Sequence, residues 1–281
     1  MSVRNPWVAG AFYPSDPDGL KATIRGCFTH KLGPMKIPER SSGTRRTVSA
    51  ICPHAGYMYS GPVAAHVYLS LASEADPESI VIIGPSHTGI GSPLSIMNKG
   101  FWKTPLGKVR IDEELSNAIL READFLDVDE SAHMREHSIE VQIPFLQYIY
   151  GSDFSFVPIC MALQDLDSSR DLGRALGKAC EGKDVLILAS TDLSHYEDQT
   201  SANRKDKLVI AAILNLDEEE LQEKVYKNRI TMCGYGPVSV ALVASKHLGA
   251  KGAELLSYHT SGDVSGDYSA VVGYASIRIL K

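Results

Sequence analysis

Three histidines stand in loops where an α/β protein could place a reactive site. His54 and His87 each come shortly after an apolar run, and Asp192 and His195 follow a third such run. Open α/β sheets bind their ligands beyond the carboxyl ends of their strands, where these loops converge. A lone loop histidine is usually structural or solvated, but three at equivalent positions predict a shared pocket.

Cys233 adds a thiol to these groups. It precedes a predicted helix start at Pro237, and both a helix N-terminus and a bound cation stabilise a thiolate. Without the histidines, Cys233 would be interpreted as a small buried apolar side chain. That is the interpretation we give to Cys27, Cys160 and Cys180.

The donor types favour a transition metal. Two imidazoles and one anionic ligand resemble the facial arrangement that leaves open positions on non-haem iron, and a thiolate in place of a carboxylate favours copper. Zinc accepts the same donors. The chain has no close-spaced cysteine pair, so a structural zinc finger is not expected.

Strands and helices are predicted to alternate around these loops. A continuous apolar run such as 79–84 indicates a strand buried on both faces. The expected fold class is α/β, with a central, mainly parallel or mixed sheet and helices on both faces, in a single domain over 1–281. The predicted strands are 45–52, 79–84, two within 94–111 around a turn at 98–100, 154–160, 185–188, and a terminal, antiparallel pair at 255–259 and 270–279. The predicted helices are 60–71 with Pro62 near its start, 112–123, 137–150 kinked or shortened at Pro144, 167–181, 202–214, 218–227 and one opening at Gly236-Pro237.

The composition indicates which kinds of partner the protein is not expected to bind and in which cellular compartment it is expected. The 281 residues carry a net charge of −6 with scattered Lys and Arg, so nucleic acid is not an expected partner. No apolar run reaches the roughly 18 residues of a membrane-spanning helix, and residues 1–6 lack an apolar signal segment. The five cysteines form no regular framework, which predicts reduced thiols and a cytoplasmic location.

Six strings distributed over nearly the whole chain give it a specific family resemblance. In combination they resemble the Memo family, also called AmmeMemoRadiSam system protein B. The strings are Trp7-Val8-Ala9-Gly10-Ala11-Phe12-Tyr13-Pro14, Pro53-His54-Ala55-Gly56-Tyr57, Gly84-Pro85-Ser86-His87, Glu136-His137-Ser138-Ile139-Glu140, Thr191-Asp192-Leu193-Ser194-His195, and Ser261-Gly262-Asp263-Val264-Ser265-Gly266-Asp267-Tyr268.

The resemblance implies a fold like that of the class III extradiol dioxygenases, which open catechol rings with iron and dioxygen. It also implies that His54, His87 and Cys233 are metal ligands, with Asp192 and His195 beside them as supporting or acid–base groups. Cys233 stands where the dioxygenases would have a metal carboxylate, and this departure separates the chain from ring cleavage itself.

The leading hypothesis is a metal-dependent oxidoreductase that holds iron or copper. His195 is the expected general base because imidazole titrates near neutral pH. Asp192 is expected to orient His195, and Tyr57 and Phe12 to line a substrate pocket. For Glu136 and His137 a capping or surface role is at least as well supported as catalysis.

Two other hypotheses use the same pocket. In one, the pocket binds an unknown small molecule or peptide without turnover, because fold does not establish function. In the other, Cys233 is the nucleophile of a hydrolase, with His195 as base and Asp192 as orienter; this leaves His54 and His87 without a role. The sequence predicts neither the substrate nor the oligomeric state.

Overall fold

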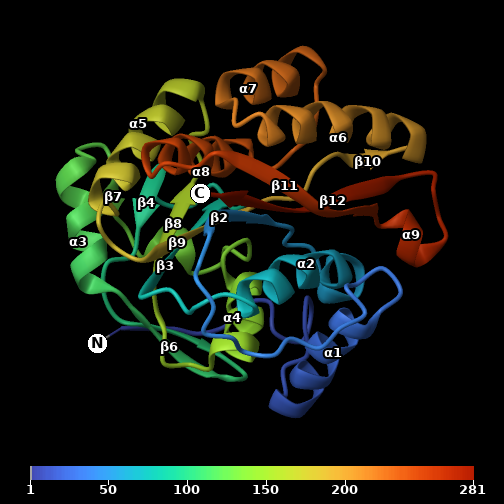
Figure 1. Cartoon of the computed structure of the whole chain (residues 1–281), viewed down its shortest axis with the longest axis horizontal. Helices are drawn as coiled ribbons and strands as arrows, with labels where there is room; N and C mark the ends of the chain where they lie inside the picture. Colours follow the sequence, from blue (N-terminus) through green and yellow to red (C-terminus); the bar gives the residue numbers. More distant parts are fainter. Residues whose placement is uncertain (1) are drawn as a thin grey trace.

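The computed structural model describes residues 2–281 as a mixed α/β fold built on one twelve-stranded sheet. Its strands follow the order β1-β5-β6-β8-β3-β9-β2-β12-β10, with β11 beside β12, and β4 and β7 off this path (Figure 1). The strands are β1 (Val3–Arg4), β2 (Thr47–Cys52), β3 (Ser79–Pro85), β4 (Leu94–Ile96), β5 (Phe101–Thr104), β6 (Gly107–Ile111), β7 (Asp127–Val128), β8 (Ser155–Met161), β9 (Val185–Ser190), β10 (His195–Glu197), β11 (Gly252–Thr260) and β12 (Val271–Leu280).

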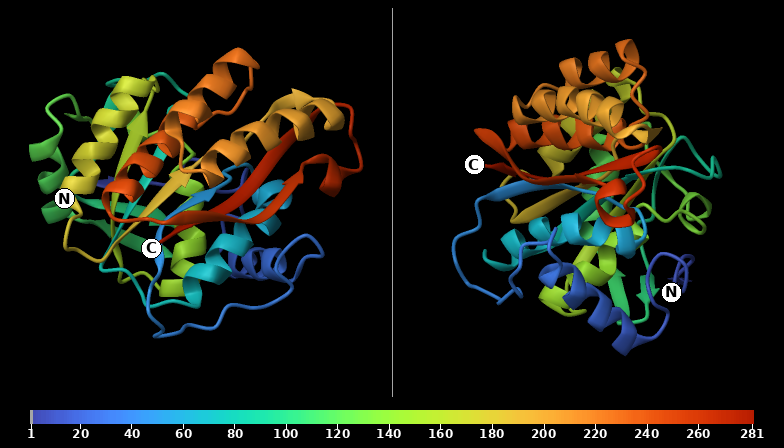
Figure 2. Two further views of the ribbon diagram at one scale, coloured as in Figure 1. Left: turned by 45° about the horizontal axis from the view of Figure 1, so that its top comes forward. Right: turned by 90° about the vertical axis from the view of Figure 1, so that its right-hand side faces the viewer.

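Helices cover both faces of the sheet, as predicted. In Figure 2, α5 to α8 lie on one side of it and α1, α2 and α4 on the other. The α-helices are α1 (Pro17–Thr29), α2 (Tyr57–Ala72), α3 (Glu113–Glu122), α4 (Ile143–Tyr150), α5 (Leu166–Ala179), α6 (Gln199–Leu214), α7 (Glu218–Lys227), α8 (Tyr235–His247) and α9 (Gly262–Ser265). The 3-10 turns are η1 (Ser131–His133) and η2 (Glu140–Gln142).

The central strands are apolar along their whole length because each side of the sheet has its own core. In β3, Val81 and Ile83 belong to the core under α5 and α8, whereas Ile80 and Ile82 belong to the core under α1, α2 and α4. Successive strand side chains point to opposite faces, so two helical layers require an uninterrupted apolar run. Burial on both faces fixes the register of the strands whose ends carry the site.

The parallel strands β3, β9 and β2 end side by side. β9 pairs with β3 on one side and β2 on the other, and Cys52 of β2 is level with Ser190 of β9. Since parallel strands end at the same edge, the loops that carry His54, His87 and Asp192 leave the sheet together. The antiparallel pairing of β11 with β12 confirms the expected terminal pair.

Pro62 lies deeper in its helix than predicted, whereas Pro144 accompanies a shortened helix, one of the two outcomes expected for it. Pro62 lies inside α2, which begins earlier, at Tyr57. The Met58 carbonyl would accept from residue 62, and because Met58 is exposed, the missing N–H costs little there. Pro144 lies in the first turn of α4, where its ring fits without a kink. The helix expected over 137–150 therefore begins only at Ile143.

A buried ion pair ties the N-terminal segment to the strand-end loops. Arg4 and Glu140 are both buried, and Arg4 Nη1 lies 2.7 Å from Glu140 Oε2. The Glu140 carboxylate also accepts the backbone N–H groups of Trp7 and Val8 and the hydroxyl of Tyr13. These bonds hold the segment that carries Phe12 against the edge of the sheet.

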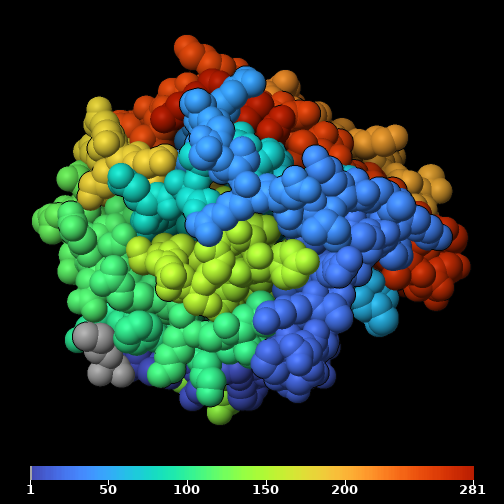
Figure 3. All heavy atoms as spheres, turned by 60° about the horizontal axis from the view of Figure 1, so that its bottom comes forward, coloured from blue at the N-terminus to red at the C-terminus, as the bar shows by residue number. Residues whose placement is uncertain are grey.

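The chain between α1 and β2 then runs along the outside of the helical layer formed by α1, α2 and α4 (Figure 3). In Figure 3 the segment before β2, in blue, lies on the surface beside α4, in yellow-green. Within residues 2–281, none of the helices combines the length and the apolar character needed to cross a membrane.

Candidate metal centre

The side chains of His54, His87 and Cys233 come together beyond the ends of β2, β3 and β9. One ligand atom from each lies within 4.8 Å of the other two. His54 Nε2 is 3.2 Å from Cys233 Sγ, and the His54 and His87 rings meet edge to face with centroids 5.1 Å apart. First-row metals bind imidazole and thiolate at roughly 2.0–2.3 Å, so small side-chain shifts bring all three around one cation.

His54 is buried and held at two points. Its backbone N–H donates to Asp192 Oδ1 at 2.8 Å, and its ring Nδ1 lies 2.9 Å from Ser190 Oγ. Burial, followed by the neighbouring histidines His137 and His87, lowers the pKa of His54 well below its ordinary value. The ring is therefore neutral near pH 7, which is the form that binds metals.

His87 is oriented by a buried carboxylate. Its Nδ1 lies 2.9 Å from Glu136 Oε1, and its backbone N–H donates to Glu136 Oε2. Burial acts to raise the pKa of Glu136, but the hydrogen bond and charge of His87 and the charge of His137 outweigh it and lower the pKa to about 2. The carboxylate accepts from Nδ1–H and leaves His87 Nε2 as the free donor atom, an arrangement common among metal-bound histidines.

The Cys233 loop packs tightly against the end of β9. The Asp192 backbone N–H points to Cys233 Sγ at 3.2 Å, and Gln164 Nε2 donates to the Cys233 carbonyl at 2.9 Å. A Cβ on Gly234 would lie 2.5 Å from the Ser190 carbonyl oxygen, so only glycine allows this close approach. Burial, and then the charge of Asp192, raise the pKa of the Cys233 thiol; a bound cation would act in the opposite direction.

Asp192 lies on the loop after β9 and His195 begins β10, and the two side chains are held by different partners. Asp192 is buried and receives the His54 backbone N–H, whereas His195 Nδ1 lies 2.8 Å from the Thr231 carbonyl. Because a carbonyl can only accept, His195 carries its hydrogen on Nδ1 and its lone pair on Nε2. Thr231 thus orients His195, where the sequence suggested Asp192. Burial raises the pKa of Asp192 to about 6, against the hydrogen bond from His54.

Of the two aromatic residues expected to line a pocket, Phe12 lies nearer the histidines. Its ring is 4.8 Å from that of His137. Tyr57 is buried instead, with its ring 4.8 Å from that of Phe145 and its hydroxyl donating to the Val141 carbonyl at 2.6 Å. The Tyr57 ring therefore packs in the core, and its backbone N–H secures the Phe12 carbonyl.

His137 is the site residue that sequence reasoning undervalued. Its ring stacks on His87 with centroids 4.5 Å apart and meets His54 edge to face at 5.4 Å. Burial, and then the charge of His87, lower the pKa of His137 to about 4, although Glu136 opposes this. The signal was present in the string Glu136-His137-Ser138-Ile139-Glu140, whose two carboxylates are both buried.

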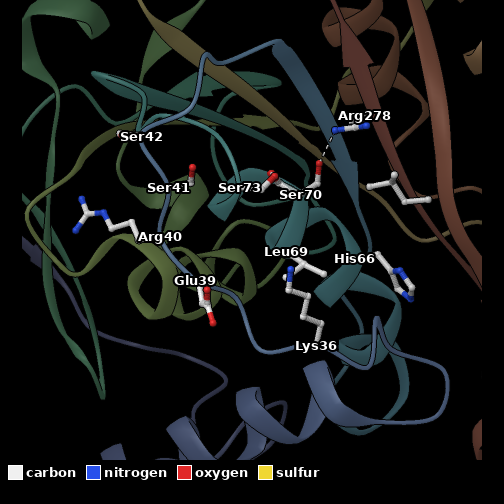
Figure 4. Close-up of a pocket in the computed structure, with 11 residues that line it drawn as sticks. Lys36, Glu39, Arg40, Ser41, Ser42, His66, Leu69, Ser70, Ser73 and Arg278 are labelled. Atoms are coloured by element: carbon white, nitrogen blue, oxygen red, sulfur yellow. Dashed lines mark hydrogen bonds between the residues drawn. The ribbon is translucent and has the colours of Figure 1, made fainter.

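A groove lies elsewhere on the molecule and holds no comparable cluster of metal ligands. It encloses about 770 Å³ between residues 36–42, α2 and the β11–β12 pair (Figure 4). Arg40 in this groove is paired with Asp76, and Arg278 with Glu254 while also donating to Ser70. Both arginines of the groove are thus paired with carboxylates, and we take the histidine–cysteine cluster as the candidate site.

The sheet and this cluster together define a mixed α/β protein with a candidate transition-metal site at the carboxyl edge of its parallel strands. Residues 4–278 match the model of the family described as Memo-like protein, and the chain belongs to that family. It is similar to a MEMO1 family protein of Methanopyrus kandleri, with 51% identity over 98% of each chain. A MEMO1 family protein of Sulfolobus acidocaldarius is 46% identical over 98% of this chain and 99% of its own.

The fold also resembles a solved structure of low sequence similarity. An uncharacterized protein of Escherichia coli K12 superposes with a TM-score of 0.57 at 12% identity, covering 83% of this chain and 99% of that one. This likeness concerns the fold alone.

Proposed function

We propose that this chain is a single-domain, cytoplasmic, metal-dependent oxidoreductase in which His54, His87 and Cys233 hold iron or copper. The observation that carries the proposal is the convergence of these three donors, from three separate loops, within 4.8 Å. Two imidazoles, one buried and one exposed, beside a thiol suit a soft or borderline transition metal better than magnesium or calcium, which prefer oxygen donors. Such an ion would supply one-electron redox chemistry.

The residues around the donors fit this role. Glu136 holds His87 with Nε2 free, and the Asp192 backbone N–H points to Cys233 Sγ as it would to a thiolate. Metal-bound histidines characteristically make such outer contacts. The family resemblance implies a fold like that of the class III extradiol dioxygenases. Because Cys233 stands where those enzymes would have a metal carboxylate, the proposed chemistry is not ring opening.

His195 is the proposed proton acceptor for the bound substrate. Its Nδ1 is held by Thr231, so the lone pair on Nε2 can take a proton. Phe12 and His137 form an apolar, aromatic contact beside the histidines that could receive an unknown small molecule or peptide.

The hydrolase alternative gains less support. Cys233 Sγ contacts His54 rather than His195, and burial raises the pKa of the thiol, which keeps it protonated and weakly nucleophilic. Binding without turnover uses the same pocket and differs from the proposal in predicting no redox change of a bound metal.

Metal analysis of protein purified anaerobically under reducing conditions tests the proposal. We expect about one iron or copper ion per wild-type chain. His54→Ala, His87→Ala and Cys233→Ser should each lower affinity by more than the roughly 10- to 100-fold cost of losing an outer contact. His195→Ala should retain the metal, because His195 is held by Thr231 outside the donor set.

The matched controls are His247→Ala on the surface of α8 and Cys180→Ser in a buried helix cap. Both should keep wild-type metal content. Equal affinity in wild-type and folded Cys233→Ser protein would refute the ligand assignment and make Asp192 the next candidate for the third donor.

A further inference from the structure

A chain of buried hydrogen bonds runs from helix α2 to the Nδ1 atom of His54. The Tyr68 hydroxyl donates to Gln142 Oε1 at 2.5 Å, and Gln142 Nε2 donates to Ser190 Oγ at 2.7 Å. Ser190 Oγ in turn lies 2.9 Å from His54 Nδ1. All four side chains are buried, so water cannot replace these bonds freely.

Two backbone carbonyls fix the direction of this chain. Gln142 Nε2 also donates to the Pro53 carbonyl at 3.0 Å, and Ser190 Oγ donates to the Ser138 carbonyl at 2.6 Å. A carbonyl oxygen only accepts, so Gln142 must turn its NH₂ toward Pro53, and Ser190 must give its single hydrogen to Ser138.

The remaining bond then has only one possible direction. With its hydrogen given to Ser138 and one lone pair taken by Gln142, Ser190 Oγ has only an acceptor position left for His54. His54 must therefore donate from Nδ1–H. A neutral imidazole has one N–H, so the lone pair lies on Nε2, the atom 3.2 Å from Cys233 Sγ.

We infer that Ser190 and Gln142 are positioning residues that hold His54 in the Nδ1–H tautomer and so present its Nε2 lone pair to the metal. The inference rests on the proposed metal site but concerns a property of the metal-free protein. His87 obtains the same tautomer from a carboxylate, Glu136, whereas His54 obtains it from a neutral network. A neutral acceptor avoids adding a further negative charge beside Cys233 and Asp192.

Removing the Ser190 hydroxyl should allow His54 to adopt its other tautomer. In Ser190→Ala, His54 Nδ1–H has no acceptor, while Nε2–H could donate to Cys233 Sγ at the distance already present. The Nε2–H tautomer then becomes populated, and Nε2 is no longer free for a metal. We expect Zn²⁺ affinity to fall about 10- to 100-fold, as for other lost outer contacts of metal ligands.

Tyr68→Phe is the matched control. It removes a buried hydroxyl of the same chain that does not contact His54, and the Gln142 NH₂ remains held by Pro53 and Ser190. Stability should fall, because the Gln142 oxygen loses a donor. The tautomer of His54 and the Zn²⁺ affinity should stay at wild-type values.

The experiment is a long-range proton–nitrogen NMR correlation on metal-free protein with ¹⁵N-labelled histidine, followed by Zn²⁺ titration. The His54 signals are assigned by their loss in His54→Gln. Wild-type protein and Tyr68→Phe should show a protonated Nδ1 and an unprotonated Nε2, and Ser190→Ala should show the reverse or a mixture.

An Nε2–H signal for His54 in the wild-type protein would overturn the inference, even if Ser190→Ala does not fold. So would a folded Ser190→Ala with wild-type tautomer and affinity, or equal shifts in Ser190→Ala and Tyr68→Phe. Absence of Zn²⁺ binding by wild-type protein would count against the proposed function, while the NMR spectrum still decides the tautomer.

Discussion

At the scale of single residues, the candidate centre depends on what holds each donor as much as on the donors themselves. Glu136 accepts His87 Nδ1–H and the backbone N–H groups of His87, His137 and Ser138. Each of these four contacts of the buried carboxylate is with a donor. A glutamine, which has the same shape but carries N–H donors, could not accept all of these hydrogen bonds.

Glu136→Gln tests this requirement. The NH₂ group of the glutamine would face N–H donors and leave them without an acceptor in a buried site. This should lower the free energy of unfolding by about 1–3 kcal/mol. Zn²⁺ affinity should fall about 10- to 100-fold because His87 is no longer fixed. Urea unfolding and metal titration measure the two effects; Glu223→Gln, on the exposed face of α7, should change neither. Unchanged values for Glu136→Gln would show that Glu136 does not orient His87.

His133 should make the protein sensitive to acid. Its imidazole is fully buried, with its ring edge to face with Trp102, and neither ring nitrogen has a hydrogen-bond partner in the described chain. Burial, and then the charge of Arg4, lower the pKa of His133 from 6.5 to about 3. Between these values the unfolded chain binds the proton and the folded chain does not, so stability falls as the pH is lowered from about 6.5 to about 3.

Replacement by leucine should remove this contribution. In His133→Leu the slope of unfolding free energy against pH over that window should drop by about one proton, or about 1.4 kcal/mol per pH unit. Urea titrations at several pH values measure the slope. Met58→Leu, at an exposed position of α2 that does not titrate, is the control with an unchanged slope. An identical slope in wild-type and His133→Leu protein would contradict a neutral buried His133.

At the scale of elements, a bulge shapes the loop that carries His195. β10 and β12 pair at His195 and at Glu197 with a register shift between them, and Tyr196 lies in the left-handed region at φ 58° with 80% of its surface exposed. A tyrosine in this conformation is strained by about 1–3 kcal/mol, and bulges beside sites often redirect side chains. The bulge leaves the His195 ring free to reach Thr231.

The same substitution at two exposed tyrosines should therefore have opposite effects. Tyr196→Gly relieves the left-handed backbone and should raise the midpoint of thermal unfolding. Tyr226→Gly, in the last turn of helix α7, should lower it, because glycine is a poor helix former and the contact of the Tyr226 ring with Tyr235 is lost. Calorimetry on the two variants decides the matter; a loss of stability in Tyr196→Gly as large as that in Tyr226→Gly would mean that the bulge is unstrained.

Sequence patterns predicted the elements better than the contacts between them. The continuous apolar runs of β3 and β9 indicated buried strands directly, and Asp112 caps α3 as expected. Helix α1 was not predicted, although Asp16 followed by Pro17 is a helix-start signal. Ser190 and Gln142 went unnoticed because hydrogen-bonding roles depend on partners far away in the chain, which spacing along the sequence does not reveal.

At the scale of the whole molecule, the sheet brings together groups that the sequence separates widely. His54 follows β2, His87 follows β3, Asp192 follows β9, and Cys233 precedes α8, yet all meet at one edge. Two cores, one on each face, hold the strands in register, so the site has a rigid base. The three donors could be predicted from the sequence, through the family resemblance and their positions after strands or before a helix. The residues that hold the donors could be identified only from the three-dimensional structure.

Anomalous X-ray scattering from crystals of the iron- or copper-loaded protein tests the metal centre most directly. We expect one strong peak at the metal absorption edge, roughly 2.1 Å from His54 Nε2 and His87 Nε2 and roughly 2.3 Å from Cys233 Sγ. The peak should be absent from Cys233→Ser crystals prepared in the same way. A peak bound by other residues, or no peak at this edge of the sheet in fully loaded wild-type protein, would contradict the proposed centre.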